Sequence, residues 1–127
     1  MTDTPVTILL AEDNKANQFI SKAMLETLGA RVLIAENGLE VLDLLEAQLV
    51  DLILMDCQMP KMDGLEATRR IRALDDPSRS TLPIVALTAD AQRQTRDECK
   101  AIGMNDFLTK PFTFDDLKRV IAEWVTR

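Results

Sequence analysis

Five side chains with complementary chemistry come directly after short apolar runs of the sequence. Glu12 and Asp13 follow VTILLA, Asp56 follows DLILM, Thr88 ends the run that begins PIVAL, and Lys110 follows DFLT. Three carboxylates within a few ångströms would repel one another and raise each other's pKa, and a divalent cation would relieve that repulsion. Oxygen ligands without histidine or cysteine favour Mg²⁺ over zinc or copper.

The other two groups suit a phosphoryl ligand. Lys110 could neutralise a non-bridging oxygen, and Thr88 could donate a hydrogen bond to another. Phosphoryl transfer needs little beyond such positioning and charge stabilisation, and the attacking group could be Asp56, since carboxylates form acyl phosphates. Taken singly, Asp13 or Thr88 could instead cap a helix, and Lys110 could be a surface charge. The joint pattern favours a site.

These residues need a framework that brings distant segments together. The apolar runs have the composition of strands buried on both faces, as in a parallel sheet. The predicted strands are Val6–Ala11, Arg31–Ala35, Asp51–Met55, Pro83–Leu87 and Asp106–Thr109. Helices are predicted over Asn14–Leu28, Leu39–Leu49, Leu65–Leu74, Ala91–Ile102 and Thr113–Val125. The polar segment Asp75–Leu82 is expected to be a loop.

This alternation predicts an α/β fold, a doubly wound five-stranded parallel sheet flanked by five helices. We expect the flavodoxin-like strand order 2-1-3-4-5. Ligands of such sheets bind beyond the carboxyl ends of the strands, where the five side chains would meet. The central DLILM strand would hold Asp56 rigidly at its tip.

Apolar residues recur at helical spacing within the predicted helices. In the first helix the apolar positions are Ala16, Ile20, Ala23, Met24 and Leu28. Trp124 is assigned to the core, and Thr113 and Asp115 are candidate caps of the last helix. The segment Ala91–Ile102 carries few and small apolar residues, so we expect a lightly anchored helix.

Composition narrows the function. The 127 residues match one domain, residues 1–127, and the net charge of −6 argues against binding nucleic acid. The two cysteines, Cys57 and Cys99, lack metal-type spacing and indicate reduced thiols and a cytoplasmic location. No apolar run approaches the roughly 18 residues needed to span a membrane, and residues 1–5 do not resemble a signal peptide. We therefore expect no membrane contact by this chain.

The motifs LLAEDN, LMDCQMPKMDG, ALTA and DFLTKPF occur in an order that resembles the receiver domain of two-component response regulators. The resemblance spans roughly residues 6 to 125. The stretches MDCQMPKMDGLEATRRIR and GMNDFLTKPF resemble most closely the receiver domains attached to hybrid sensor histidine kinases.

The resemblance implies a role for each site residue. Asp56 matches the phosphoacceptor and a metal ligand, and Asp13 matches the acidic residue that ligates Mg²⁺ directly. Glu12 matches the acidic residue that commonly acts through metal-bound water, and the backbone carbonyl of Gln58 matches the third protein ligand. Thr88 matches the switch hydroxyl, Phe107 the aromatic switch position, and Lys110 the lysine that contacts the phosphoryl oxygens. The Lys110–Pro111 bond is expected to be cis. Side chains at Gln58 and Asp90 are expected to tune the lifetime of the phosphoryl group.

The resemblance also implies partners. The chain has no histidine, so the phosphohistidine donor would belong to a histidine kinase or a histidine phosphotransfer protein. Asn17, Ile20 and Met24 could form a docking patch with Phe112, although Phe112 could equally pack against the last helix. We expect a monomer or weak homodimer that dephosphorylates itself slowly and is not a conventional enzyme. Cys57, beside the site, is expected to be inert, with a redox input as the alternative.

Two other functions are compatible with a strand-end aspartate or this fold class. A haloacid-dehalogenase-type phosphatase would carry a second Asp where this chain has Gln58. A flavodoxin-like FMN carrier would want a Ser/Thr/Gly-rich phosphate loop where this chain has Glu12 and Asp13. The sequence leaves open whether the chain is a stand-alone regulator or a domain of a larger protein such as a hybrid kinase.

Overall fold

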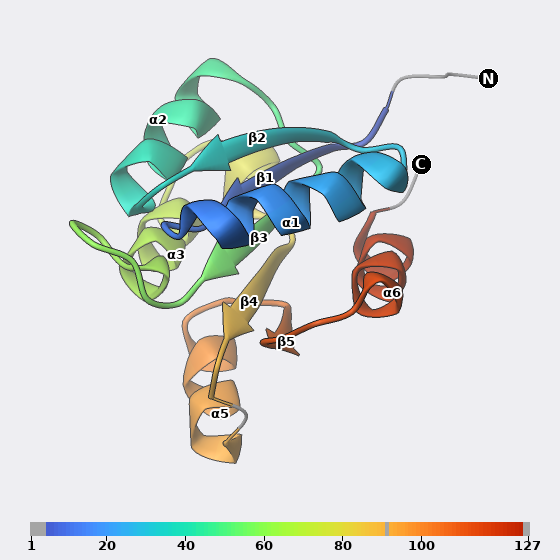
Figure 1. The fold of residues 1–127 in the computed structure, drawn as a ribbon. Helices are drawn as coiled ribbons and strands as arrows, with labels where there is room; N and C mark the ends of the chain where they lie inside the picture. Colours follow the sequence, from blue (N-terminus) through green and yellow to red (C-terminus); the bar gives the residue numbers. More distant parts are fainter. Residues whose placement is uncertain (1–4, 91, 126–127) are drawn as a thin grey trace.

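The computed structural model describes residues 5–90 and 92–125, and its centre is a five-stranded parallel sheet (Figure 1). The strand order is β2-β1-β3-β4-β5, as predicted. The strands are β1 (Thr7–Ala11), β2 (Arg31–Ala35), β3 (Leu52–Asp56), β4 (Ile84–Thr88) and β5 (Asp106–Thr109). Residues 1–4, where no signal peptide was expected, and Ala91, the predicted start of a helix, lie outside the described residues.

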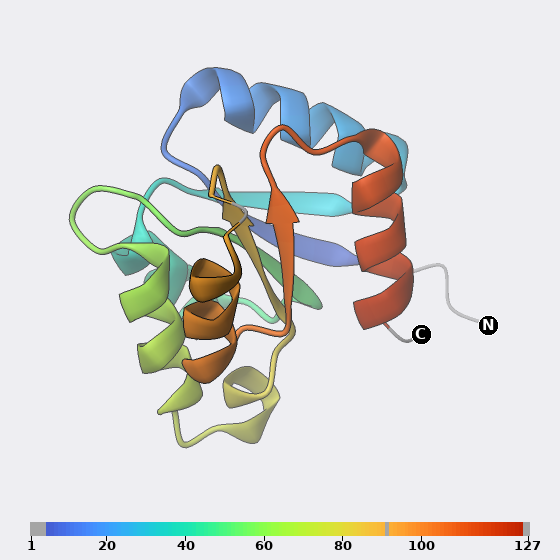
Figure 2. The ribbon, with the colours of Figure 1, turned by 90° about the horizontal axis from the view of Figure 1, so that it is seen from below.

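Helices cover both faces of the sheet (Figure 2). The helices α1 (Lys15–Thr27) and α6 (Phe114–Trp124) bury their apolar sides on one face, where Leu25, Leu117 and Val120 join the core. The other face is covered by α2 (Gly38–Ala47), α3 (Gly64–Arg72) and α5 (Arg93–Ala101). The strands therefore face apolar side chains on both sides, which explains their nearly continuous apolar sequences.

The central strand β3 is the most completely enclosed part of the sheet. All five of its residues are buried, and it pairs with β1 on one side and β4 on the other. Ala11 of β1 pairs with Met55, and Asp56 pairs with Leu87 of β4. This register brings the carboxyl ends of the three strands to one edge, with Asp56 at its centre.

The buried side of α1 is only partly apolar. Its buried residues are Gln18, Ser21 and Leu25. Of the apolar positions at helical spacing, Ala16, Ile20 and Ala23 are exposed, and Met24 and Leu28 are half-buried. Asn14 caps the helix by accepting a hydrogen bond from the Asn17 N–H, so the capping alternative for Asp13 is wrong.

The expected loop Asp75–Leu82 contains a single-turn helix, α4 (Pro77–Ser80), so the described residues hold six helices instead of five. Asp76 caps this turn by accepting from the Ser78 N–H, and Pro77 has the fixed φ that suits a first helical position. One turn is too short to show an apolar period. At the last helix Thr113, and not Asp115, forms the cap, through a reciprocal capping box with Asp116.

The helix α5 is weakly anchored, as expected. Among the described residues of α5, only Cys99 is buried. The N-cap residue of the helix, Gln92, makes no side-chain capping hydrogen bond. Trp124 is half-buried, not fully enclosed, and its indole N–H donates to Asp106 at 2.8 Å. No helix within residues 5–90 and 92–125 is both long and apolar enough to cross a bilayer.

Candidate functional site

Three carboxylates meet at the edge of the sheet where β1 and β3 end. Glu12, Asp13 and Asp56 each offer an oxygen, and these oxygens lie within 4.8 Å of one another. The Glu12 and Asp56 side chains are buried, whereas Asp13 is exposed to solvent. Mg²⁺ prefers oxygen ligands, so this all-oxygen cluster has the donor chemistry of a magnesium site.

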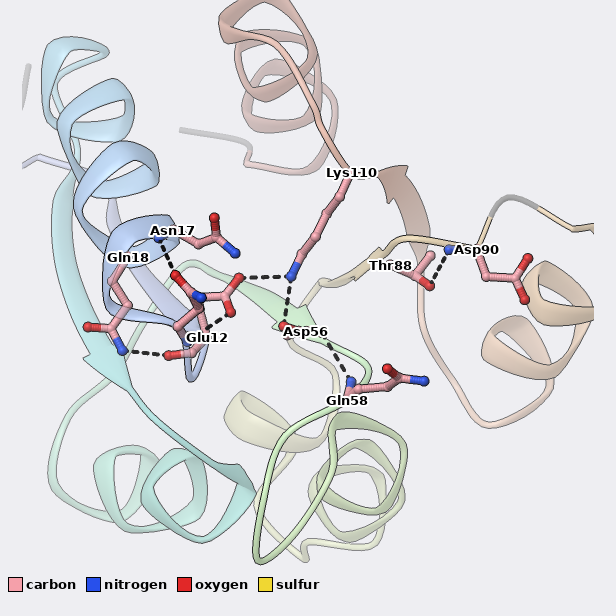
Figure 3. A network of polar contacts seen from close by, with 9 residues as sticks. Glu12, Asn17, Gln18, Asp56, Gln58, Thr88, Asp90 and Lys110 are labelled. Carbon is pink, nitrogen blue, oxygen red and sulfur yellow. Dashed lines mark hydrogen bonds and ion pairs between the residues drawn. The ribbon is translucent and has the colours of Figure 1, made fainter.

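Lys110 reaches into this cluster from the end of β5. Its ammonium donates to Glu12 Oε1 at 2.9 Å and to Asp56 Oδ2 at 2.8 Å (Figure 3). Burial raises the pKa of Glu12, and the hydrogen bond from Lys110 opposes that rise. Burial lowers the pKa of Lys110, but its bonds with Asp56 and Glu12 outweigh burial and leave that pKa raised. The cation therefore balances two carboxylates in a largely enclosed place.

The chain after β3 is built to hold Asp56 in place. The Gln58 N–H donates to Asp56 Oδ1 at 3.0 Å, and the Gly64 N–H donates to the Cys57 carbonyl at 3.2 Å. A Cβ added at Gly64 would lie 2.1 Å from the Asp56 carbonyl oxygen. Gly64 is therefore required for close approach of α3 to the tip of β3.

Thr88 ends β4 with a hydroxyl that is already hydrogen-bonded. Its Oγ1 accepts from the Asp90 N–H at 3.0 Å (Figure 3). Asp90 in turn accepts from the Gln92 N–H at 2.9 Å and from the Thr95 hydroxyl at 2.7 Å. The Thr95 hydrogen bond and the Gln92 N–H lower the pKa of Asp90. Thr88 thus belongs to the turn into α5 and does not cap that helix.

Phe107 on β5 lies half-buried against the α2–α3–α5 side of the core. The guanidinium of Arg96, on α5, lies 5.0 Å from the centre of its ring, within the range of a cation–π contact. Phe107 is therefore in contact with α5, the weakly anchored helix.

Beyond β5, the Lys110–Pro111 peptide bond is cis.

The four residues of the expected docking patch lie around one groove between α1 and the segment after β5. Ile20 is 55% exposed, Asn17 is exposed and Met24 is half-buried. Phe112 is half-buried and packs against the α1–α6 side of the core, yet it also lines the groove. Both readings of Phe112 thus describe part of its environment. Pro111 and Lys110 connect this groove to the acidic cluster.

The two cysteines lie close together behind Asp56. Cys57 Sγ and Cys99 Sγ are 4.0 Å apart, and both residues are free and buried. Burial, together with the neighbouring Cys99, raises the pKa of Cys57 to about 12. Because the thiolate is the reactive form, this raised pKa favours the expectation that Cys57 is unreactive, while the short distance between the two sulfurs leaves the redox alternative open.

Sequence reasoning missed one polar residue of the site. The amide of Gln18, buried on α1, donates to the Glu12 carbonyl oxygen at 2.6 Å (Figure 3). The sequence around Gln18 does not indicate that its side chain is buried, because a polar residue of a helix is usually exposed. Only the packing of α1 against the sheet reveals it.

Comparison with known proteins gives consistent matches over nearly the whole chain. The family model described as response regulator receiver domain matches residues 8–122. The sensor protein GacS of Pseudomonas syringae pv. syringae is 41% identical over 118 residues, which cover 92% of this chain and 13% of that protein. The chain therefore spans only a small part of such a relative.

Two solved structures resemble the chain closely. One is the receiver domain of the sensor histidine kinase PA1611 from Pseudomonas aeruginosa PAO1, with a magnesium ion coordinated in its active-site cleft. It has a TM-score of 0.87 and 44% identity, covering 95% of this chain and 98% of that one. The other comes from the complex of the Saccharomyces cerevisiae phosphotransfer protein Ypd1 with the receiver domain of Ssk1. It has a TM-score of 0.88 and 32% identity, covering 95% of this chain and 89% of that one.

Proposed function

The chain belongs to the response regulator receiver domain family of two-component signal transduction, and we propose that it is a phosphorylation-dependent switch whose phosphoacceptor is Asp56. The observation that carries the proposal is the position of this carboxylate, buried at the tip of β3 within bonding distance of Lys110 and beside Glu12 and Asp13. In this proposal a partner's phosphohistidine supplies the phosphoryl group.

The transfer is a displacement at phosphorus. An Asp56 carboxylate oxygen forms the new P–O bond while the P–N bond to the partner's imidazole breaks, and the electron pair of that bond leaves with the imidazole nitrogen. Lys110 stabilises the negative charge on the phosphoryl oxygens. The Gln58 N–H, which donates to Asp56 Oδ1, orients the nucleophile. The same geometry serves a small acyl phosphate, whose carboxylate is then the leaving group.

Mg²⁺ is the proposed cofactor, held by the carboxylates of Glu12, Asp13 and Asp56 and the carbonyl of Gln58. When bound, it supplies positive charge that offsets the mutual repulsion of carboxylates and phosphoryl oxygens. The all-oxygen donor set and the magnesium ion in the PA1611 receiver domain support this assignment.

The proposed output is a shift between two conformations. The phosphoryl group would draw the Thr88 hydroxyl away from the Asp90 N–H, and Phe107 would turn inward into the space that Thr88 leaves. That movement would break the contact of Phe107 with Arg96 and repack α5. Helix α5 suits this role because a single buried side chain among its described residues anchors it.

The proposed partner is a histidine kinase or a histidine phosphotransfer protein, as the Ypd1–Ssk1 complex suggests. We assign its docking surface to Asn17, Ile20, Met24 and Phe112, because the groove that they line opens next to Lys110. Phosphoryl transfer requires the donor imidazole to come close to Asp56. A partner seated on this groove could deliver it.

Ile20→Asp tests that surface. A charge in the centre of an apolar contact is expected to slow phosphotransfer from a phosphorylated histidine phosphotransfer domain of the same organism by about 30-fold. Phosphorylation by a small acyl phosphate is expected to be unchanged, because that donor needs no docking. Leu49→Asp, at a position 66% exposed outside the groove, is the matched control. Equal transfer rates to Ile20→Asp and Leu49→Asp would refute the assignment.

Gln58 and Asp90 are proposed to set the lifetime of the phosphoryl group. Both side chains are exposed and line the same pocket as Asp56. Asp90→Gln removes a carboxylate that could accept a proton from attacking water, and is expected to lengthen the lifetime by about tenfold. The measurement is the first-order loss of acyl phosphate after the donor is removed. An unchanged decay rate in the double exchange Gln58→Asp with Asp90→Gln would contradict the proposal.

We further propose that residues 1–127 form a single receiver domain, and that this domain belongs to a cytoplasmic protein that is a monomer or weak homodimer. It makes no contact with nucleic acid or membrane and is a phosphoacceptor, not a conventional enzyme. One sheet joins all the described strands, which supports a single domain. The two free thiols, Cys57 and Cys99, suit a reducing compartment. Because relatives such as GacS are much longer, a place within a hybrid kinase is part of this proposal.

The test of the central proposal is incubation with Mg²⁺ and acetyl phosphate, followed by intact-mass and peptide mass spectrometry. The expected result is a stable gain of one phosphoryl group, located on the peptide that contains Asp56. Rapid turnover of the donor with no accumulated phosphoprotein would indicate a phosphatase instead.

A further inference from the structure

We propose that Gln18 is a positioning residue for the metal site, acting by holding the peptide group that joins Glu12 to Asp13. The inference rests on the proposed function, because it concerns how the Mg²⁺ ligands are oriented. Gln18 lies near the start of α1 and is only 7% exposed. A buried carboxamide needs hydrogen-bond partners, and those of Gln18 include the backbone of Glu12, a member of the acidic cluster.

The backbone N–H and the backbone carbonyl of Glu12 both form hydrogen bonds with residues of other elements. Its N–H donates to the Ala35 carbonyl of β2 at 2.9 Å. Its carbonyl accepts from Gln18 Nε2 at 2.6 Å (Figure 3), and the same nitrogen lies 3.4 Å from Glu36 Oε2. Gln18 therefore connects the loop after β1 to the loop after β2.

These hydrogen bonds fix the backbone from which the Glu12 and Asp13 side chains extend. Glu12 is the first residue after β1, where the chain turns toward α1, and its carbonyl belongs to the peptide that sets the direction of Asp13. Asp13 is exposed, so packing gives its side chain little orientation. The Glu12 carboxylate also accepts from the Asn14 N–H at 3.1 Å. Rotation of this peptide would move both metal ligands at once.

A purely structural role for Gln18 makes a different prediction. In that case its amide merely satisfies a buried carbonyl, and its loss lowers stability without affecting the metal. A positioning role predicts lower stability and also weaker Mg²⁺ binding, because residues that orient metal ligands typically contribute about tenfold or more to affinity. Mg²⁺ affinity therefore separates the two roles.

The experiment uses Gln18→Met, which preserves the length of the side chain and removes its donor. Mg²⁺ is titrated into the metal-free protein by calorimetry, and amide hydrogen exchange at Glu12 and Asn14 is measured by NMR without metal. The variant is expected to bind Mg²⁺ about tenfold more weakly and to exchange both amides faster. The control is Thr68→Val on α3, which deletes a buried donor to the Gly64 carbonyl at 2.7 Å.

Wild-type Mg²⁺ affinity in Gln18→Met, or unchanged exchange at Glu12 and Asn14, would overturn the inference, and so would equal weakening in Thr68→Val. Should Gln18→Met fail to fold, Gln18→Asn retains the carboxamide one methylene too short and is expected to weaken Mg²⁺ binding likewise. Failure of the wild type to bind Mg²⁺ or to be modified at Asp56 would instead refute the proposed function. The metal-free exchange measurement would then still show whether Gln18 holds the peptide that joins Glu12 to Asp13.

Discussion

Asp56→Asn is expected to leave a folded protein that gains no phosphoryl group from acetyl phosphate or from a phosphohistidine donor. The amide has the shape of the carboxylate but lacks its charge, so its oxygen is too weak a nucleophile to form an acyl phosphate. The expected loss of incorporated phosphate is complete within the sensitivity of intact-mass spectrometry. Among the described residues, no other carboxylate accepts hydrogen bonds from both Lys110 and the Gln58 N–H.

The fold should survive this substitution because Lys110 retains its bond to Glu12. Asp43→Asn, on the exposed side of α2, is the matched control: it makes the same chemical change away from the site and should be modified like the wild type. Phosphoryl incorporation by Asp56→Asn at the wild-type level would show that the acceptor lies elsewhere, whatever the family resemblance implies.

The sheet could be predicted from the sequence because two-sided burial leaves a direct record in it. A strand such as β3, enclosed by helices on both faces, must be apolar at consecutive positions, and only Asp56 at its tip breaks the run. Once the strands were identified, parallel topology required their carboxyl ends to meet. The positions of Glu12 and Lys110 followed from that constraint and needed no knowledge of side-chain contacts.

The α1 surface was not predictable in the same way. Ile20 and Ala16 have helical spacing with other apolar residues, yet they are exposed, while Gln18 and Ser21 face the sheet. Helical periodicity identifies a face but does not say what covers it. An apolar face reserved for a partner has the same pattern as a core face, and a buried amide that bonds a backbone carbonyl has the pattern of a solvated residue. These exceptions lie beside the proposed site, where binding requirements compete with packing.

Lys110→Met is expected to slow phosphorylation by acetyl phosphate by about 100-fold, as is typical when one preorganised charge-stabilising donor is removed. The ammonium forms ion pairs with Glu12 and Asp56 in the structure, and in the proposed mechanism it also stabilises the phosphoryl oxygens during the reaction. Its removal leaves two buried carboxylates, 3% and 8% exposed at their side chains, without their shared cation. Thermal unfolding of the metal-free variant should therefore show a loss of about 3 kcal/mol.

Mg²⁺ separates these two functions of Lys110. Because the metal ion supplies positive charge to the same carboxylates, saturating Mg²⁺ should restore most of the lost stability of Lys110→Met. It should not restore the rate, since the phosphoryl oxygens still lack their ammonium partner. Lys118→Met, an exposed position on α6, controls for the loss of one positive charge from the chain. A Lys110→Met protein that is phosphorylated as fast as Lys118→Met would mean that Lys110 is only a counter-ion of the resting site, and the proposed role of its ammonium in the transfer would have to be abandoned.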